Sequence, residues 1–217
     1  FASSAMQYIN IHTHHPPQPN EWAIQNMYNN FEQIYEPGNY SIGLHPWYLN
    51  DEWKTAFEAL QHSASHRHIK AIGECGLDKL TKTDFALQQV VFAQQIELAN
   101  QINKPLIIHC VKAYEEVLQQ LMQAKVPVVF HGFNKGKQLA LQIIYAGHYL
   151  SFGNVLLQPR MQEVLKTIPL NKIFLETDDA AETIQRIYGR AAAILSIDEV
   201  SLSLQLWKNA EKVFVII

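Results

Sequence analysis

Cysteine and long apolar runs are the features that this sequence most lacks. Its 217 residues contain two cysteines, Cys75 and Cys110, without the CxxC spacing of a redox or zinc motif. This low content predicts a reducing compartment without a disulfide framework, and we expect a cytoplasmic protein. No apolar run approaches the roughly 20 residues that span a bilayer, so we expect no membrane partner.

An excess of charge of one sign is also missing. The formal net charge of −3 gives no global attraction for nucleic acid, so any contact with a polyanion has to be local. No GxGxxG motif follows the first apolar run, which disfavours a dinucleotide-binding fold. The abundant residue type with distinctive chemistry is histidine, with ten copies.

The length and composition fit one globular domain. Residues 1–5 precede Met6, and we interpret them as a cloning or tag-cleavage remnant. With 48% hydrophobic residues, the chain can bury a sizeable core, and we expect residues 6–217 to form a single domain.

Short β-branched and apolar runs recur along the chain, most of them separated by helical patterns. We predict eight strands, at Gln7–Ile11, Trp22–Met27, Tyr40–Leu44, Ile69–Gly73, Pro105–Ile108, Val126–Phe130, Tyr149–Phe152 and Lys172–Leu175. Apolar residues at i, i+3 and i+4 spacing predict amphipathic helices at Asp51–His66, Asp84–Asn103, Ala113–Ala124, Lys137–Ala146 and Arg160–Thr167. The tail predicts two further helices, Ala181–Leu195 and one that is capped by Ser196 or Asp198 and runs through Trp207. In Asp84–Asn103 we expect the apolar residues to face the sheet and the glutamines to face water.

This alternation predicts an α/β fold, a (β/α)₈ TIM barrel. The strands are too apolar for a sheet with one wet face, which favours a parallel sheet covered by helices, and eight repeats favour closure into a barrel. The first two connections are the exceptions. His12–Glu21 contains three prolines, and Asn29–Asn39 has room for at most two helical turns. We therefore expect one early outer helix to be missing or shortened.

Histidines and carboxylates follow the predicted strands at the end where such barrels carry their active sites. These residues are His12, His14, His45, Glu74, His109, His131 and Asp178. Alternate residues of a strand point the same way, so both imidazoles of the His12-Thr13-His14 run can reach one metal ion. The carboxylate of Glu74 and further histidines complete a set suited to Zn²⁺, Mn²⁺, Ni²⁺ or Fe²⁺. A divalent ion lowers the pKa of a water, and Asp178 can take the proton of that water.

The segments NIHTHH (10–15), SIGLHPWYL (41–49), AIGECGLD (71–78), PLIIHC (105–110), VVFHGF (128–133) and FLETD (174–178) resemble the TatD-like metal-dependent hydrolases. The resemblance implies a TIM barrel with one or two divalent metals (Zn, Mg, Mn, Ni or Fe), and deoxyribonuclease activity in some members. It implies that His12, His14 and Asp178 are ligands of one metal and that Glu74 is a bridging carboxylate. It further implies that His109 and His131 bind the second metal and that His45 lies near the substrate or its phosphate.

The sequence departs from the family pattern in the loops that follow these residues. Cys110-Val111-Lys112-Ala113 stands where the family has a Ser-Arg-Asp-Ala-like run, so an expected arginine is absent. Gly132–Gly136 and Asp179–Ala181 also differ from the family runs, and the stretch between the HxH pair and the GLHP segment is shorter than typical. These positions concern the substrate rather than the metal, so the hydrolytic chemistry is expected to be intact.

Three functions stay open on this sequence. The first is a phosphodiesterase or deoxyribonuclease acting on single-stranded DNA, with Asp178 as general base, Glu74 as a catalytic carboxylate and His45 holding a phosphate oxygen. Trp47 and Tyr48 could then stack on a base. The second is an amidohydrolase-like C–N or lactone hydrolase that uses the same metals. The third is a metal-binding barrel without catalysis, which Asp178 and an open coordination position argue against.

Overall fold

A computed structural model of the protein describes residues 6–31, 34 and 37–216. The chain folds into two compact units, which we call the terminal unit (residues up to 25 and from 131) and the central unit (residues 26–130). Residues 1–5, interpreted above as a remnant, lie outside the described residues. The single domain over 6–217 stays a prediction.

The terminal unit contains parallel strands from both ends of the chain. β1 (Tyr8–Thr13) pairs with β2 (Glu21–Met27), and β7 (Tyr149–Phe152) pairs with β8 (Ile173–Leu175). An isolated bridge between Thr13 and Asp178 continues the contact of β1 with the segment after β8. The helices of this unit are α4 (Lys137–Tyr145), α5 (Pro159–Thr167), α6 (Ile184–Leu195) and α7 (Glu199–Val213), with short 3₁₀ turns at Asn154–Leu157 and Leu170–Lys172.

The terminal unit joins α6 to β1 through a buried tyrosine. The hydroxyl of Tyr188 donates to the carbonyl of Ile9 at 2.8 Å and accepts the Ile9 amide at 3.0 Å. Both polar groups of one strand residue are therefore satisfied by a single side chain, which a buried strand requires. This contact fixes the strand that ends at the histidine pair.

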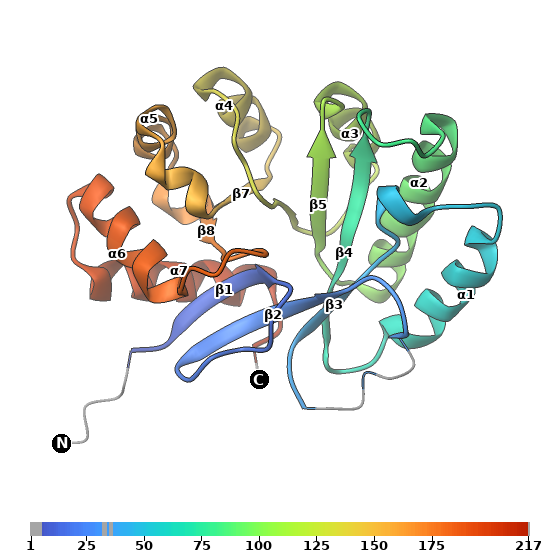
Figure 1. Ribbon diagram of the computed structural model, residues 1–217, viewed down its shortest axis with the longest axis horizontal. Helices are drawn as coiled ribbons and strands as arrows, with labels where there is room; N and C mark the ends of the chain where they lie inside the picture. Colours follow the sequence, from blue (N-terminus) through green and yellow to red (C-terminus); the bar gives the residue numbers. More distant parts are fainter. Residues whose placement is uncertain (1–5, 32–33, 35–36, 217) are drawn as a thin grey trace. The chain divides into compact units, whose positions relative to one another are not determined.

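The central unit holds the parallel strands β3 (Tyr40–Ile42), β4 (Ile69–Asp78), β5 (Leu106–Val111) and β6 (Val128–Phe130) in that order. Its helices are α1 (Trp53–Ala64), α2 (Phe85–Ile102) and α3 (Tyr114–Leu121), with a 3₁₀ turn at Pro46–Tyr48. Figure 1 shows α2 alongside β4. Every residue of β4 is buried, as expected for a strand covered on both faces.

The predicted elements are present. All eight strands and all seven helices are found, with shifts of one to several residues at their ends, and the cap of α7 is Asp198, whose side chain accepts from the Ser201 amide. Among the described residues of 14–20 and 28–39 there is no α-helix, so the expected loss of an early outer helix is confirmed there. In the part of the chain that the structure describes, no helix is long and apolar enough to cross a membrane.

β4 extends further than its sequence pattern predicts. The predicted strand stops at Gly73, whereas β4 pairs with β5 as far as Asp78 opposite Val111. The pairing shifts register between Ile72 and Cys75, which is an irregularity of the β-bulge kind. Glu74 lies within this irregularity. Glu74 was predicted to follow the end of this strand. It lies instead within the strand, at the irregularity.

The expectation that the glutamines of the second helix face water is wrong for two of them. Gln88 is buried, accepts the Asp78 amide at 2.8 Å and donates to the Asp78 carbonyl at 3.0 Å. Gln95 is buried as well and makes the matching pair of bonds with Leu44, at 2.8 and 3.2 Å. The backbone N–H and C=O groups of Leu44 and Asp78 are buried and need hydrogen-bond partners. A glutamine amide can donate to the carbonyl and accept from the N–H at the same time.

Gly76 is the position of β4 where a side chain fits least. Its φ is +142°, and a Cβ there would lie 2.0 Å from the carbonyl oxygen of His109. We predict that Gly76→Ala destabilises the fold by about 3 kcal/mol or more, because backbone strain and a clash with the neighbouring strand add up. Urea unfolding of the two proteins measures this. A loss below about 1 kcal/mol would show that β4 and β5 can separate without cost.

His148 is predicted to make the terminal unit sensitive to acid. Burial, with the nearby charge of Lys172, lowers the pKa of His148 from 6.5 to about 4. The folded protein then holds this ring neutral, while the unfolded chain takes up a proton below pH 6.5. Stability is therefore lost as the pH falls from about 6.5 to about 4, by at most about 3 kcal/mol.

The matched variant is His148→Gln, which has no titrating ring. We expect the wild-type protein to lose more free energy of unfolding than this variant between pH 7 and pH 5, by about 1 to 2 kcal/mol. Urea titrations at both pH values give the comparison. Equal losses in the two proteins would contradict the neutral buried state of His148.

Candidate metal centre

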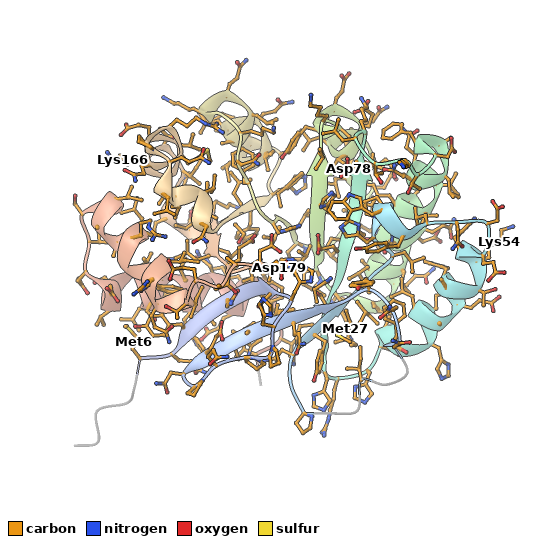
Figure 2. All side chains as sticks on the ribbon, in the orientation of Figure 1. Met6, Met27, Lys54, Asp78, Lys166 and Asp179 are labelled. Carbon is orange, nitrogen blue, oxygen red and sulfur yellow. The ribbon has the colours of Figure 1, made fainter. Side chains whose placement is uncertain are left out.

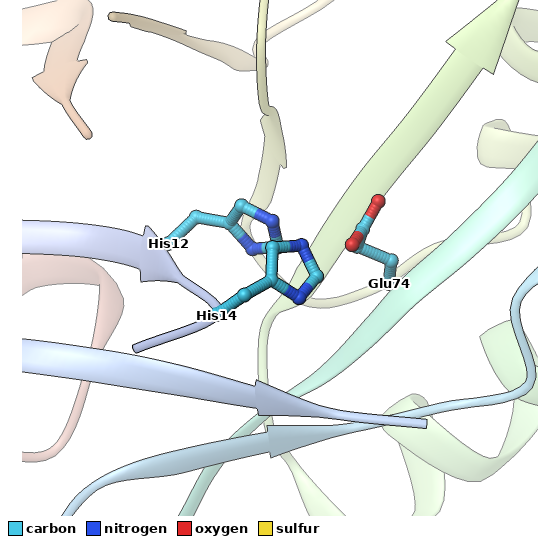
Figure 3. A group of neighbouring side chains, drawn as sticks. All are labelled: His12, His14 and Glu74. Carbon is cyan, nitrogen blue, oxygen red and sulfur yellow. The ribbon is translucent and has the colours of Figure 1, made fainter. Parts of the chain in front are cut away.

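The terminal unit brings four of the predicted residues together. His12 lies in β1 and is fully buried, and His14 follows the end of the strand, with ring centroids 5.0 Å apart (Figure 3). The Nε2 atoms of both rings lie 3.2 Å from Oδ1 of Asp178. The ring of His131 lies 4.1 Å from that of His12. We call His12, His14, His131 and Asp178 the terminal cluster.

Backbone pairing places Asp178 opposite the histidine pair. The Asp178 amide donates to the carbonyl of His12 at 2.9 Å, and the His14 amide donates to the carbonyl of Asp178 at 3.1 Å. Asp178 itself has a positive φ of 55°. The chain after β8 thus continues beside β1 for one more residue pair, which turns the carboxylate toward both imidazoles.

Two buried residues that the sequence analysis did not select hold this arrangement. Asn10 donates to the Thr177 hydroxyl at 2.8 Å and accepts the Thr177 amide at 3.2 Å, which fixes the loop before Asp178. Glu176 is 1% exposed, and its Oε1 lies 3.3 Å from Nδ1 of His131. In the sequence, only their positions indicate a role: Asn10 lies two residues before His12, and Glu176 lies two residues before Asp178.

The charge state of Asp178 follows from its neighbours. Burial raises the pKa of this carboxyl, but the hydrogen bonds with His12 and His14 outweigh burial, and the net pKa lies well below the usual range. Asp178 is therefore an ionised carboxylate at neutral pH. An anion facing two or three imidazoles is a set of donors that suits a divalent cation.

The central unit forms a second cluster around Glu74. Figure 3 shows the side chain of Glu74, which belongs to β4. Its Oε2 lies 3.3 Å from Nε2 of His45 and 3.5 Å from Nδ1 of His109. The Glu74 side chain is 5% exposed, and Asn26 holds it by accepting the Glu74 amide at 2.8 Å. We call His45, Glu74 and His109 the central cluster.

Asp78, the last residue of β4 (Figure 2), orients His109. Its Oδ2 lies 2.9 Å from Nε2 of His109 and accepts the indole N–H of Trp47 at 2.6 Å. Burial raises the pKa of Asp78, but the hydrogen bonds from Trp47, His109 and the Leu80 amide together have the larger, opposite effect. The net pKa of Asp78 is therefore lowered. The ionised carboxylate keeps the proton of His109 on Nε2 and turns Nδ1 toward Glu74, as carboxylate–histidine pairs do at metal sites. Asp78 ends the AIGECGLD segment, and nothing in that segment alone indicates its contact with His109.

The hydrogen bonds assign each ring a different role. Nδ1 of His45 accepts the Trp47 amide at 3.1 Å, so the neutral ring carries its proton on Nε2 and is a donor toward Glu74. By contrast, His109 carries its proton on Nε2, toward Asp78, so the lone pair is on Nδ1. His131 carries its proton on Nδ1, toward Glu176, so the lone pair that suits a metal is on Nε2. His45 therefore suits an oxygen acceptor better than a cation.

Ligand atoms close enough for one cation occur within each unit. In the terminal cluster, single donor atoms of His12, His131 and Asp178 lie within 4.8 Å of one another, and the same holds for His45, Glu74 and His109 in the central cluster. His12, His131 and Asp178 thus fit a divalent ion by the chemistry of their donors, as do Glu74 and His109, whereas the hydrogen bond from the Trp47 amide makes His45 a donor. His109 and His131 lie in different units, so their sharing of one metal, like the bridging role of Glu74, stays a prediction.

Three residues lie next to the clusters in the sequence. Cys75 is fully buried, and burial together with Glu74 raises the pKa of its thiol. Nε2 of His15, which is exposed, lies 3.3 Å from Oδ1 of Asp179. The two cysteines, Cys75 and Cys110, both lie in the described part of the chain and form no disulfide.

Comparison with known proteins places the chain in a family. The family model for TatD related DNase matches residues 6–215. The uncharacterized metal-dependent hydrolase YjjV of Escherichia coli K12 is 30% identical over 152 residues, which is 66% of this chain and 59% of YjjV. YabD of Bacillus subtilis, described in the same words, is 32% identical over 145 residues, which is 64% of this chain and 57% of YabD. The matches thus span less than two thirds of these relatives.

Solved structures show the fold. The crystal structure of YjjV, a TatD homologue from Escherichia coli K12, aligns with a TM-score of 0.86 at 22% identity, over 98% of this chain and 99% of that one. A TatD family hydrolase from Entamoeba histolytica aligns at 0.78 with 16% identity, over 97% and 98%. The fold is the predicted (β/α)₈ barrel, and the resemblance drawn from the motifs is confirmed. This chain belongs to the TatD related DNase family.

Proposed function

We propose that this chain is a divalent-metal-dependent phosphodiesterase that cleaves single-stranded DNA. The observation that carries the proposal is the terminal cluster, where an ionised carboxylate faces two imidazoles at 3.2 Å. The names of the relatives, metal-dependent hydrolases, and the description of the family as DNase support the same reaction class.

Residues of both clusters would hold the metal. We assign His12, His14, His131 and Asp178 to an ion in the terminal cluster, and Glu74 with His109 to an ion in the central cluster. When bound, a divalent ion polarises the phosphoryl oxygen and lowers the pKa of water, as Zn²⁺, Mn²⁺ and Mg²⁺ do in other hydrolases. The imidazole-rich ligands favour Zn²⁺, Mn²⁺, Ni²⁺ or Fe²⁺ over Mg²⁺.

The protein's own groups would handle the proton and the phosphate. Asp178, ionised at neutral pH, accepts the proton of the attacking water through its carboxylate. His45 donates the proton of Nε2 as a hydrogen bond to a non-bridging phosphate oxygen, because the Trp47 amide keeps Nδ1 as an acceptor. Asp78 and Glu176 keep their histidines in the tautomer that binds metal.

Cleavage of a labelled single-stranded oligonucleotide, with Mg²⁺, Mn²⁺ or Zn²⁺ supplied in turn, tests the proposal. We expect metal-dependent release of shorter products. Turnover of a small ester or amide with no cleavage of DNA under any metal would overturn it.

A C–N or lactone hydrolase is the second candidate. It is favoured by the Cys110–Ala113 run, which lacks the arginine of the family pattern, a side chain suited to binding phosphate. An uncharacterized amidohydrolase of Saccharomyces cerevisiae shares the fold, with a TM-score of 0.74 at 12% identity over 96% of this chain and all of that one. The same screen with amide and lactone substrates separates the two candidates.

A further inference from the structure

A cavity of about 520 Å³ opens beside His45 in the central unit. Residues before α1 and in its first two turns form part of the lining, together with Tyr28 and Asn29, which directly follow β2. Its lining includes Tyr28, His45, Tyr48, Leu49, Asn50 and Trp53. We call this cavity the aromatic pocket.

Two tyrosines form an exposed pair in this pocket. The rings of Tyr28 and Tyr48 lie 4.8 Å apart between centroids, at 31° to each other, and are 44% and 54% exposed. The ring of Tyr48 in turn lies 5.4 Å from that of His45. Exposing two large rings to water has no benefit for folding, whereas π faces of this kind bind the face of a planar ring.

Trp47, which the sequence suggested as a stacking residue together with Tyr48, has another task. Its indole N–H donates to Asp78, and its carbonyl accepts the Thr83 hydroxyl at 3.2 Å. Because these bonds fix the ring against the carboxylate that orients His109, Trp47 supports the cluster. The partner of Tyr48 in the pocket is Tyr28, which lies 20 positions earlier in the chain.

The charge of the pocket excludes a second phosphate. Among the described residues that line it, the carboxylate of Glu52 is the side chain that is charged at neutral pH, with His45 as the titratable neighbour. An anion would be repelled there, while a neutral ring would not. Asn29, Asn50 and Thr55 add polar groups to a lining that is otherwise largely apolar, and such groups can bond the polar edge of a ring.

We propose that the aromatic pocket binds one nucleobase of the substrate, stacked on Tyr48 and Tyr28, next to the phosphate that His45 contacts. The inference rests on the proposed function and narrows it: the substrate is a nucleotidyl ester with a base beside the scissile phosphate. Stacking accepts any base, so the pocket gives a preference for nucleic acid without reading its sequence.

Binding can be measured without catalysis. A short oligonucleotide with 2-aminopurine at each position in turn is titrated with the protein in EDTA, because stacking on an aromatic ring quenches the fluorescence of this base. We expect quenching at one position. Tyr48→Ala and Tyr28→Ala should each weaken binding by about 5- to 150-fold, the range for one lost base–aromatic stack.

Two further variants make the comparison specific. Tyr48→Phe keeps the ring and should quench like the wild-type protein. Tyr145→Ala removes a tyrosine that is 83% exposed at the end of α4, outside the pocket, and should also behave as wild type. Quenching that survives in Tyr48→Ala, or that is absent in the wild-type protein, would overturn the proposal.

Cleavage separates this inference from the proposed function. Replacing one nucleotide beside the scissile bond by an abasic residue should lower kcat/KM by about 5- to 150-fold in the wild-type protein and have little effect in Tyr48→Ala. DNA cleavage that is indifferent to the abasic residue overturns the base pocket and leaves the phosphodiesterase standing. No cleavage of any diester overturns the phosphodiesterase, and the quenching result then decides the pocket alone.

Discussion

Asp178→Asn is expected to lower kcat for phosphodiester cleavage by about 10²- to 10⁴-fold, the range for loss of a positioned general base. The amide keeps an oxygen that can face a metal ion, but it cannot take a proton from water. Steady-state cleavage of a single-stranded oligonucleotide at saturating metal measures the effect. Metal bound by the purified variant, measured by mass spectrometry of the elements, should stay close to that of the wild-type protein.

The matched control is Asp179→Asn, one residue further along the same loop. The Asp179 side chain is 81% exposed and pairs with His15, outside the terminal cluster. This variant should retain nearly full activity. Full activity in Asp178→Asn would remove that residue from the base role, and equal losses in both variants would mean that the loop as a whole, and not one proton acceptor, is required.

Glu74→Gln is expected to reduce both metal binding and activity, with kcat/KM lower by about 10²- to 10³-fold. The carboxylate is buried, and its Oε2 faces His45 at 3.3 Å and His109 at 3.5 Å. The Glu74 side chain is 5% exposed, against 44% for Asp178, so water cannot replace the lost charge and a neutral amide weakens cation binding more at Glu74 than at Asp178. Titration of the metal-free variant with Mn²⁺ should show weaker binding than in the wild-type protein.

Glu116→Gln gives a comparison in the same unit. Glu116 lies in α3 and forms an ion pair with Lys79 near the surface. Loss of an exposed pair changes stability by about 1 kcal/mol at most and should leave metal binding unchanged. Unchanged Mn²⁺ affinity in Glu74→Gln would contradict its place among the ligands.

The sequence was sufficient to predict the elements of the fold and the family. Periodicity of 2 and 3.6 residues is a local property, so all eight strands and seven helices could be predicted from short windows. The prediction that His12 and His14 lie close together also depends on a short window only, because strand alternation places both rings on one side of β1. The two rings do meet, with centroids 5.0 Å apart, while their binding of a metal stays a prediction.

The partners that hold those residues could not be predicted in the same way. Gln88 and Gln95 read as the polar face of an amphipathic helix, since nothing near them shows that Asp78 and Leu44 need bonds there. The tautomer of His45 likewise depends on a backbone amide two residues away whose direction is set by a 3₁₀ turn. Such contacts depend on tertiary register, which short windows do not contain.

The pairing of Tyr48 with Tyr28 could not be predicted from the sequence either. Tyr48 lies three residues after His45, while Tyr28 belongs to a different segment of the chain. Trp47 is nearer still to His45 in the sequence, but its indole N–H donates to Asp78. Adjacent aromatics in a sequence therefore predict a functional surface less well than the side chains that meet in space.

Metal-dependent turnover is the measurement that tests the central claim most directly. The protein is stripped with a chelator, its residual metal is measured, and cleavage of single-stranded DNA is followed as Mn²⁺ or Zn²⁺ is returned. We predict that the stripped protein is inactive and that activity rises in step with the metal bound by the histidine–carboxylate clusters. Undiminished cleavage by protein shown to be metal-free would contradict the account.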